Sequence, residues 1–513
     1  VDAAIAALAE QEIFQRGGGL MDIVRDPENG EGGVVLPTGE PRVRITPYAR
    51  VYELCMLAAR FEAKKADPEK ALKLDQDRAY SWQEVDPPGP VVKTLIERGE
   101  WSHIRPLDAM VSWPVLRPDG TIFDSAGYDA RTRCYSTAST RIDLPPCITP
   151  DHVQRAIALI DDVLSDFPFE QPAHKSSWYA ALLSVLARPA VKGPVPMVIF
   201  DANDRGSGKT LLCDIIGGIL TGQRVPRRGV PEKGSEDEWG KLMLGIGIGS
   251  YPVVLFDNVT GTLRSATLDM VLTGETYQGR VLGLNKEMKV PIRTQFLVSC
   301  NNAMISSDLV RRSLHSRLVC EDERPEMREG FKYNLPADVC EPGLRKRLLE
   351  AAFTILIGYE QAGRPRVQKR PIGSYEAWAD RIQSAIIWAG LPDPVETQDE
   401  LRQQASSEDD LRGQFLEAWF DMFGDKAVTL RDALQQASDE TDKTHYGVEN
   451  PKAKTLLDVV SQLGDGRKVT TGNLSYKVRS WNGKVQNGLS ICPGPNHSGS
   501  MAWFIKVSPT RLR

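Results

Sequence analysis

The sequence predicts a multidomain α/β protein built around a parallel sheet, and three observations lead to this prediction. The chain has 513 residues, too many for one hydrophobic core, so three or four domains are expected. Strand-length apolar runs alternate with helical patterns between about 190 and 330, as they do in parallel sheets covered by helices. The first of these runs, PVPMVIF, leads directly into the glycine-containing loop DANDRGSGKT.

Composition and charge exclude several classes of protein. No apolar run reaches the roughly 18 residues that a membrane span needs, and the start, VDAAIAALAEQEIF, lacks the features of a signal peptide. Because the chain begins without methionine, we expect an upstream part to be missing. Eight scattered cysteines without a C-x-x-C pair disfavour a zinc site and a disulfide framework, which fits a reducing cytoplasm, and six dispersed histidines disfavour metal ligation by side-chain nitrogen. The net charge of −5 leaves nucleic-acid contacts to local basic patches.

Residues 1–150 predict an N-terminal α+β domain. Within it, WPVLRPDGTIF predicts two short strands joined by a Pro-Asp-Gly turn. Asp119, Asp124 and Asp129 fit no known metal loop and are interpreted as turn and surface acids. Two apolar patterns of helical spacing then predict a helical connector over 151–189.

The loop DANDRGSGKT matches the phosphate-binding pattern G-x-x-x-x-G-K-[ST] at all but one position. Gly208, Lys209 and Thr210 match, whereas Asn203 stands where the first glycine is expected. Asparagine tolerates left-handed backbone angles better than other non-glycine residues, so we expect the loop still to turn, with Gly206 adding freedom. The flanking strand PMVIF and helix TLLCDIIGGIL would direct backbone N–H groups at a phosphate. The candidate nucleotide-binding residues are Asn203, Asp204, Arg205, Gly206, Ser207, Gly208, Lys209, Thr210 and Leu211.

Two later apolar runs end in polar residues that suit such a site. YPVVLFDNV places Asp257 at the carboxyl end of its strand, where Mg²⁺ coordination requires a carboxylate. Asn258 follows it, at the position where a water-activating glutamate is usual. TQFLVSCNN ends in Asn301, which could orient an attacking water near a γ-phosphate.

A run of arginines comes next. SSDLVRRSLHSRL predicts a helix that carries Arg311, Arg312 and Arg317. A solvated helix face is one interpretation of these charges. The other is that they are arginine fingers, which stabilise transition-state charge in a neighbouring subunit.

With these pieces in this order, residues 190–332 resemble AAA+ ATPases and, more narrowly, the superfamily-3 helicases and primase-helicases of phages and plasmids. FDNVTG is similar to the acid-bearing strand end of that family, VSCNN to its sensor 1 and DLVRRSLHSRL to its finger region. The resemblance implies ATP and Mg²⁺ as cofactors and a helical lid over 333–395. It implies a catalytic set of Lys209, Asp257, Asn258, Asn301, Arg311 and Arg312, with Thr210 and Asp257 as the Mg²⁺ ligands.

The resemblance leaves the general base open. Asn258 cannot take a proton, so the water would be oriented by Asn258 and Asn301, or by an acid from elsewhere such as Glu275. Hydrolysis could then be slow, and a nucleotide-binding switch that does not hydrolyse ATP remains an alternative.

The stretch TYQGRVLGLNKEMKVPIRTQ lies between the acid-bearing strand and sensor 1. In the helicases that it resembles, a hairpin at this place projects into the central channel and grips single-stranded DNA. Arg280, Lys286 at the tip, and Lys289 would contact phosphates. A plain surface hairpin is the alternative.

The end of the chain predicts a linker, or the lead-in to a helix, over 396–410 and a small domain over 411–513. Three helical patterns followed by two apolar runs, GLSICPGPNHSGSMAWFIKV, outline a winged helix. Lys477, Arg479 and Lys484 lie on or after the third helix, where DNA contacts are expected. A protein-binding or oligomer-forming winged helix is the alternative.

The leading interpretation is a ring-forming, hexameric, ATP-driven DNA helicase that replicates a phage, plasmid or other mobile element in a bacterial cytoplasm. Its partners would be single-stranded or forked DNA and a primase or polymerase, located upstream in the chain or in another protein. IFQRGGGLMDIVRD and GYDARTRCY resemble prophage helicase-like proteins and imply a collar or DNA-entry domain. One alternative is an ATP-regulated DNA-binding initiator without processive unwinding. Another is a remodelling or defence ATPase, which would need an aromatic-glycine pore loop where VPRRGVPEKGSEDEW stands.

Overall fold

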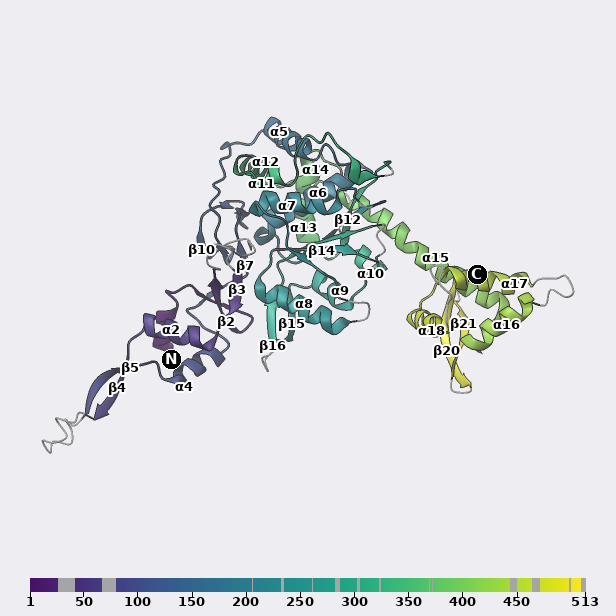
Figure 1. Cartoon of the computed structure of the whole chain (residues 1–513), viewed down its shortest axis with the longest axis horizontal. Helices are drawn as coiled ribbons and strands as arrows, with labels where there is room; N and C mark the ends of the chain where they lie inside the picture. The colour runs from purple at the N-terminus through teal and green to yellow at the C-terminus, as the bar shows by residue number, and fades with distance from the viewer. Residues whose placement is uncertain are drawn as a thin grey trace. The chain divides into compact units, whose positions relative to one another are not determined.

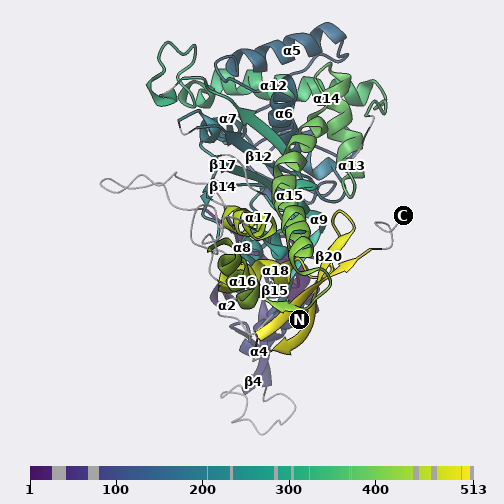
Figure 2. The same ribbon diagram turned by 90° about the vertical axis from the view of Figure 1, so that its right-hand side faces the viewer.

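The computed structural model divides into two compact units, Val1–Leu401 and Arg402–Arg513, and each is described by itself. Figure 1 labels many of the elements named below, and Figure 2 shows the same ribbon turned by 90°. No helix in the described ranges is both long and apolar enough to cross a membrane. The structure describes residues 1–25, 42–66, 80–204, 206–231, 235–260, 262–281, 287–301, 305–322, 324–368, 370, 372–442, 450–463, 471–497 and 500–508.

The N-terminal part of the first unit mixes short helices with small sheets. A sheet in the order β3-β2-β1-β6 shares a small hydrophobic core with three helices. The predicted Pro-Asp-Gly hairpin is confirmed, because β8 and β9 pair in antiparallel fashion on either side of that turn. The helices are α1 (Asp2–Leu8), α2 (Tyr48–Ala58) and α4 (Gly89–Glu97); the strands are β1 (Ile13–Arg16), β2 (Gly19–Val24), β3 (Arg42–Ile45), β4 (Phe61–Ala66), β5 (Tyr80–Val85), β6 (Arg105–Pro106), β7 (Ala109–Val111), β8 (Val115–Leu116), β9 (Ile122–Phe123), β10 (Gly127–Asp129) and β11 (Cys134–Ser136).

A five-stranded parallel sheet organises the rest of the first unit. Its order is β13-β14-β17-β12-β18, and the predicted strands PMVIF, YPVVLFDNV and TQFLVSCNN correspond to β12, β14 and β17. All residues of β12 and β17 are buried, which explains why these segments are continuous apolar runs. Because β17 lies between β12 and β14, the residues that follow these strands meet at one edge of the sheet. The strands are β12 (Met197–Ala202), β13 (Arg227–Arg228), β14 (Val253–Val259), β17 (Gln295–Cys300) and β18 (Ser313–Leu318).

Helices cover both faces of this sheet. Leu255 of β14 joins the main core, to which α6 and α7 contribute, whereas Phe256 stacks on Phe296 and meets Trp239 of α8 edge-on. Helices from 151–189 and 333–395 belong to the same core, and α5 and α12 lie side by side in Figures 1 and 2. The elements are α5 (Pro150–Val163), α6 (Pro172–Leu186), η1 (Arg188–Ala190), α7 (Lys209–Thr221), α8 (Glu236–Gly249), α9 (Ala266–Thr273), α10 (Ser307–Val310), η2 (Pro325–Met327), α11 (Ala337–Cys340), α12 (Pro342–Gln361), α13 (Glu376–Trp378), η3 (Ala379–Gln383), α14 (Ser384–Trp388) and η4 (Pro394–Glu396).

The helix predicted for SSDLVRRSLHSRL is wrong over most of its length. Only α10 is helical, and Ser313–Leu318 forms the edge strand β18, paired along its whole length with β12. The spacing of apolar residues in a run as short as SSDLVRRSLHSRL is compatible with a helix and with a strand. Pairing with β12 makes Ser313–Leu318 a strand.

The second unit contains the predicted order of helices followed by a terminal hairpin. Helix α15 (Thr397–Phe423) includes almost all of 396–410, the range expected to be a linker or the lead-in to a helix. A small sheet in the order β19-β21-β20 then packs with the helices around a separate core. The elements are β19 (Val428–Thr429), α16 (Leu430–Asp442), α17 (Pro451–Gln462), α18 (Thr471–Ser480), β20 (Leu489–His497) and β21 (Ser500–Val507).

Candidate nucleotide-binding site

The loop between β12 and α7 has the backbone of a phosphate-binding loop. Gly206 and Gly208 have φ angles of 75° and 96°, in the left-handed region that favours glycine. A Cβ atom on Gly208 would also lie 2.9 Å from the ring of Phe167. Helix α7 begins at Lys209, so the free N–H groups of its first turn lie at the loop. Arg205 lies outside the described residues.

Asn203 does not turn the loop in the way that the sequence suggested. In the described part of this loop, the residues with left-handed backbone angles are Gly206 and Gly208, and Asn203 is not one of them. Instead, Asn203 Nδ2 donates a hydrogen bond of 2.8 Å to the carbonyl oxygen of Cys320, and its Oδ1 accepts one of 3.1 Å from the Cys320 N–H. The asparagine therefore fastens the start of the loop to the segment that leaves β18.

Lys209 and Asn301 meet at the edge of the sheet. Lys209 Nζ donates a hydrogen bond of 2.6 Å to Asn301 Oδ1 and one of 3.1 Å to the backbone carbonyl of Asp204. Lys209 is only 9% exposed, and this burial lowers the pKa of its ammonium group, an effect that the nearby carboxylate of Asp201 opposes. The ammonium group is therefore positioned where a bound phosphate would lie.

Asp257 and Thr210 lie side by side. The hydroxyl of Thr210 donates to Asp257 Oδ1 at 3.1 Å, and the hydroxyl of Ser299 donates to the same oxygen at 2.6 Å. A guanidinium nitrogen of Arg227 lies 3.5 Å from Asp257 Oδ2. A carboxylate beside a hydroxyl is the hard oxygen set that Mg²⁺ prefers, so this pair fits the cation. Neither Ser299 nor Arg227 was among the residues predicted from the sequence. For Ser299 the available signal was a polar residue inside the buried run TQFLVSCNN.

Asn258 has a structural reason to be asparagine. It has a φ of 53°, in the left-handed region, at a bulge where the pairing of β14 with β17 shifts register. Its N–H donates to the hydroxyl of Ser299 at 2.8 Å, and the residue is exposed. Asparagine is the side chain that best tolerates this backbone, so the departure from glutamate matches the local conformation.

Glu275 is not an alternative base. Its carboxylate lies 3.8 Å from where a Cβ on Gly193 would be, and its carbonyl accepts from the N–H of Ile292. Gly193 precedes β12, whereas the phosphate-binding loop follows it. Glu275 is therefore at the opposite edge of the sheet from Lys209, and the suggestion that it activates water is wrong.

A cavity of about 470 Å³ adjoins the loop. Its walls include residues 206–208 and the aromatic rings of Phe167, Phe331 and Tyr333. The guanidinium of Arg328 lies 5.4 Å from the centre of the Phe331 ring. A cavity of this size with aromatic walls can hold a planar base and its ribose beside the loop that would hold the phosphates.

The three candidate finger arginines have different surroundings. Arg317 lies on β18 and forms ion pairs with Asp201 at 2.7 Å and with Glu170 at 3.2 Å, so it is an internal structural residue. The side chain of Arg312 is 19% exposed and lies 3.1 Å from Asp269. That of Arg311 is 65% exposed. Arg311 is therefore better placed than Arg312 to reach another molecule.

The candidate DNA-contacting residues fall into two groups. In the first unit, β15 (Thr276–Arg280) and β16 (Glu287–Pro291) form the expected hairpin, which buries Tyr277, Met288 and Val290. Arg280 and Lys289 lie on its exposed face, and Lys286 lies outside the described residues.

In the second unit, Lys477 Nζ donates to the carbonyl of Leu463 at the end of α17, at 2.8 Å. Its ammonium group therefore stabilises that helix end. Arg479 on α18 and Lys484 just after α18 are exposed.

No protein-family model and no curated protein matches this chain. Among solved structures, the A form apo structure of the NrS-1 C-terminal region is 11% identical, covering 89% of this chain and 99% of that one, with a TM-score of 0.33. The X-ray structure of JCV helicase is 16% identical, covering 47% of this chain and 67% of that one, with a TM-score of 0.20. An inhibitor-bound JCV helicase has the same identity and coverage and a TM-score of 0.21. These likenesses are remote, and the interpretation of the site depends on its own residues.

Proposed function

We propose that this protein is an ATP-dependent, ring-forming DNA helicase that serves replication of a phage, plasmid or other mobile element. The observation that carries the ATPase part is the meeting of Lys209, Thr210, Asp257 and Asn301 at one edge of the sheet, beside an aromatic-walled cavity. The hexameric ring, the superfamily-3 type and the action on single-stranded DNA are supported by the sequence resemblance.

In this proposal each group has a role that its position supports. Lys209 and the first turn of α7 hold the phosphates of ATP, and the cavity lined by Phe167 holds the nucleoside. Thr210 and Asp257 hold Mg²⁺, which would neutralise charge on the transferring phosphate. Arg311, the more exposed of the two neighbouring arginines, reaches the nucleotide of the adjacent subunit.

DNA contact is proposed for the exposed face of the β15–β16 hairpin and for the second unit. Arg280 and Lys289 share that hairpin face with Glu287, so the patch is basic but not uniformly so. In the second unit Arg479 and Lys484 are the proposed contacts, whereas Lys477 is engaged with α17.

A second function is favoured by one observation. Asn258 occupies the position of the usual base with a backbone that suits asparagine, and its side chain cannot accept a proton. An ATP-regulated DNA-binding initiator, which binds the nucleotide and hydrolyses it slowly or not at all, would need no base there.

ATP hydrolysis with and without single-stranded DNA separates these functions. The intact chain is compared with Lys209→Ala and with Lys192→Ala, an exposed lysine just before β12 that serves as the matched control. A helicase shows hydrolysis that DNA stimulates, that Lys209→Ala reduces on the order of 100-fold and that Lys192→Ala leaves unchanged. Binding of ATP without hydrolysis would reject the helicase in favour of the initiator. Hydrolysis that survives Lys209→Ala would reject the site itself.

A further inference from the structure

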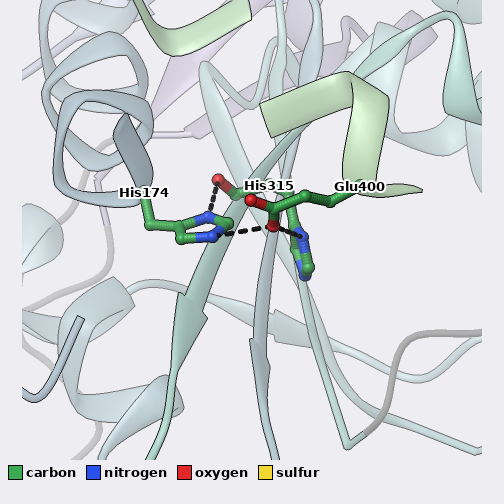
Figure 3. A group of neighbouring side chains, drawn as sticks. All are labelled: His174, His315 and Glu400. Atoms are coloured by element: carbon green, nitrogen blue, oxygen red, sulfur yellow. Dashed lines mark hydrogen bonds and ion pairs between the residues drawn. The ribbon is translucent and has the colours of Figure 1, made fainter. Parts of the chain in front are cut away.

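The structure brings together two histidines that are 141 residues apart in the sequence. His174 of α6, His315 of β18 and Glu400 in the first turn of α15 each direct one atom at a common point, and these atoms lie within 4.8 Å of one another. Figure 3 shows the arrangement. The two imidazole rings are nearly perpendicular, with centres 5.1 Å apart. The dispersal of the histidines in the sequence, which disfavoured metal ligation by side-chain nitrogen, concealed this cluster.

Hydrogen bonds fix the tautomer of each ring. His174 Nδ1 lies 3.0 Å from the backbone carbonyl oxygen of His315, which can only accept, so this nitrogen carries a proton. His315 Nε2 lies 3.2 Å from the carboxylate of Asp201 and donates to it in the same way. When the rings are neutral, the remaining nitrogens, Nε2 of His174 and Nδ1 of His315, therefore present lone pairs.

Both lone pairs are directed at the carboxylate of Glu400. Its Oε2 lies 2.9 Å from His174 Nε2 and 3.9 Å from His315 Nδ1, and neither nitrogen is hydrogen-bonded in the described chain. Neither histidine side chain has exposed surface, so water cannot reach the two nitrogens to relieve their repulsion with the carboxylate, whose side chain is 28% exposed. Glu170 Oε2 lies 3.5 Å from His174 Nε2 and is also paired with Arg317 at 3.2 Å. A cation at this point would satisfy all of these groups.

We propose that His174 Nε2, His315 Nδ1 and the Glu400 carboxylate bind a structural zinc ion, separate from the nucleotide site. Two imidazoles and a carboxylate are ligands that suit Zn²⁺, whereas Mg²⁺ and Ca²⁺ prefer oxygen alone. Zinc bonds of about 2.0–2.1 Å in a tetrahedron place ligand atoms roughly 3.4 Å apart. The distances of 2.9 and 3.9 Å from Glu400 Oε2 to the two nitrogens lie on either side of this value. A water molecule or Glu170 completes the set.

The groups around the ligands support the assignment. Ligating histidines usually donate their second N–H to a carbonyl or a carboxylate, which sets the tautomer, and here the His315 carbonyl and Asp201 accept these bonds. The ion would join α6, β18 and the start of α15. Asp201 lies on β12, just before the phosphate-binding loop, so the same network supports the base of that loop.

Metal content and thermal stability of the purified full chain test this proposal. The ligand variant is Glu400→Gln, which preserves the shape of a half-buried side chain, and the control is Glu396→Gln, an exposed glutamate four residues earlier. We expect about one zinc ion per chain in the wild type, Glu396→Gln and Lys209→Ala, and zinc affinity at least tenfold lower in Glu400→Gln. A strong chelator should lower the melting temperature of the wild type but not that of Glu400→Gln. Cobalt substitution should give the intense visible absorption of a tetrahedral site.

Two results would overturn the proposal. If the folded wild type neither contains zinc nor gains thermal stability when zinc is added, the cluster is an ion pair between a protonated histidine and Glu400. If Glu400→Gln and His174→Gln both fold, as judged by circular dichroism, and still bind zinc with wild-type affinity, the ion lies elsewhere.

Discussion

Replacing Asn203 by glycine restores the usual residue of a phosphate-binding loop, yet the structure predicts that this change destabilises the protein. The backbone at Asn203 has no need of glycine, because the left-handed positions of the loop are Gly206 and Gly208. The asparagine side chain instead makes two hydrogen bonds to the backbone of Cys320, a buried residue. Glycine would remove both bonds and leave a buried N–H and carbonyl without these partners.

The size of the effect follows from these contacts. Each lost hydrogen bond costs about 0.5–1.5 kcal/mol of unfolding free energy. The greater freedom of glycine in the unfolded chain adds about 0.4–1 kcal/mol. We therefore expect Asn203→Gly to lower the unfolding free energy by about 1.5–4 kcal/mol. Asn203→Ala, which loses the bonds without introducing glycine, should lower it by about 1–3 kcal/mol.

Urea unfolding of the full chain measures these differences. The transition that MgATP shifts to higher urea belongs to the unit with the loop and is the one to compare among the wild type and the two variants. Asn203→Gly should have the lowest midpoint and Asn203→Ala an intermediate one. If Asn203→Gly is as stable as the wild type, or more stable and a tighter binder of ATP, the bonds to Cys320 contribute nothing and the reasoning fails.

Three further predictions concern the acid-bearing strand, the arginine pair and the hairpin. Ser299→Ala removes the hydroxyl that donates to Asp257 at 2.6 Å, so it should lower the unfolding free energy by about 1–3 kcal/mol. It should also weaken Mg²⁺-dependent ATP binding measured by calorimetry. Ser307→Ala, the control at an exposed position, should change neither quantity. Burial raises the pKa of Asp269 above its ordinary 3.8, and the nearby Arg312 opposes this rise. The contribution of Asp269 to stability is therefore present below pH 3.8 and is lost as pH rises through the raised pKa. Arg312→Gln should extend this loss to higher pH in urea titrations and Arg311→Gln should extend it less, whereas an Arg312→Gln profile equal to that of the wild type would refute the coupling. Lys289→Gln should reduce the slope of the logarithm of the single-stranded DNA binding constant against the logarithm of salt concentration by about 0.7. The control is Lys93→Gln on α4, an exposed lysine outside the hairpin. An unchanged slope in Lys289→Gln, or an equal change in Lys93→Gln, would exclude a specific contact by the hairpin.

Local patterns were sufficient to predict the core of the fold. The continuous apolar runs of β12, β14 and β17 are characteristic of strands buried on both faces, and the glycines before Lys209 mark the loop between a strand and a helix. Each of these signals lies within about ten residues of the chain. The helix predicted around Arg317 failed because its segment is short and its conformation depends on pairing with β12, more than a hundred residues away.

The sequence by itself determined that Lys209 and Asp257 end up at the same edge of a sheet, since parallel strands carry their carboxyl ends to one side. Only the tertiary structure decided what surrounds them. The order of the strands places β18 beside β12, and this neighbour gives Asn203 its partner Cys320, makes Arg317 an internal residue and brings His315 to His174. Such contacts depend on which strands pair, and the choice of neighbour is made by packing across the whole core rather than by any short segment.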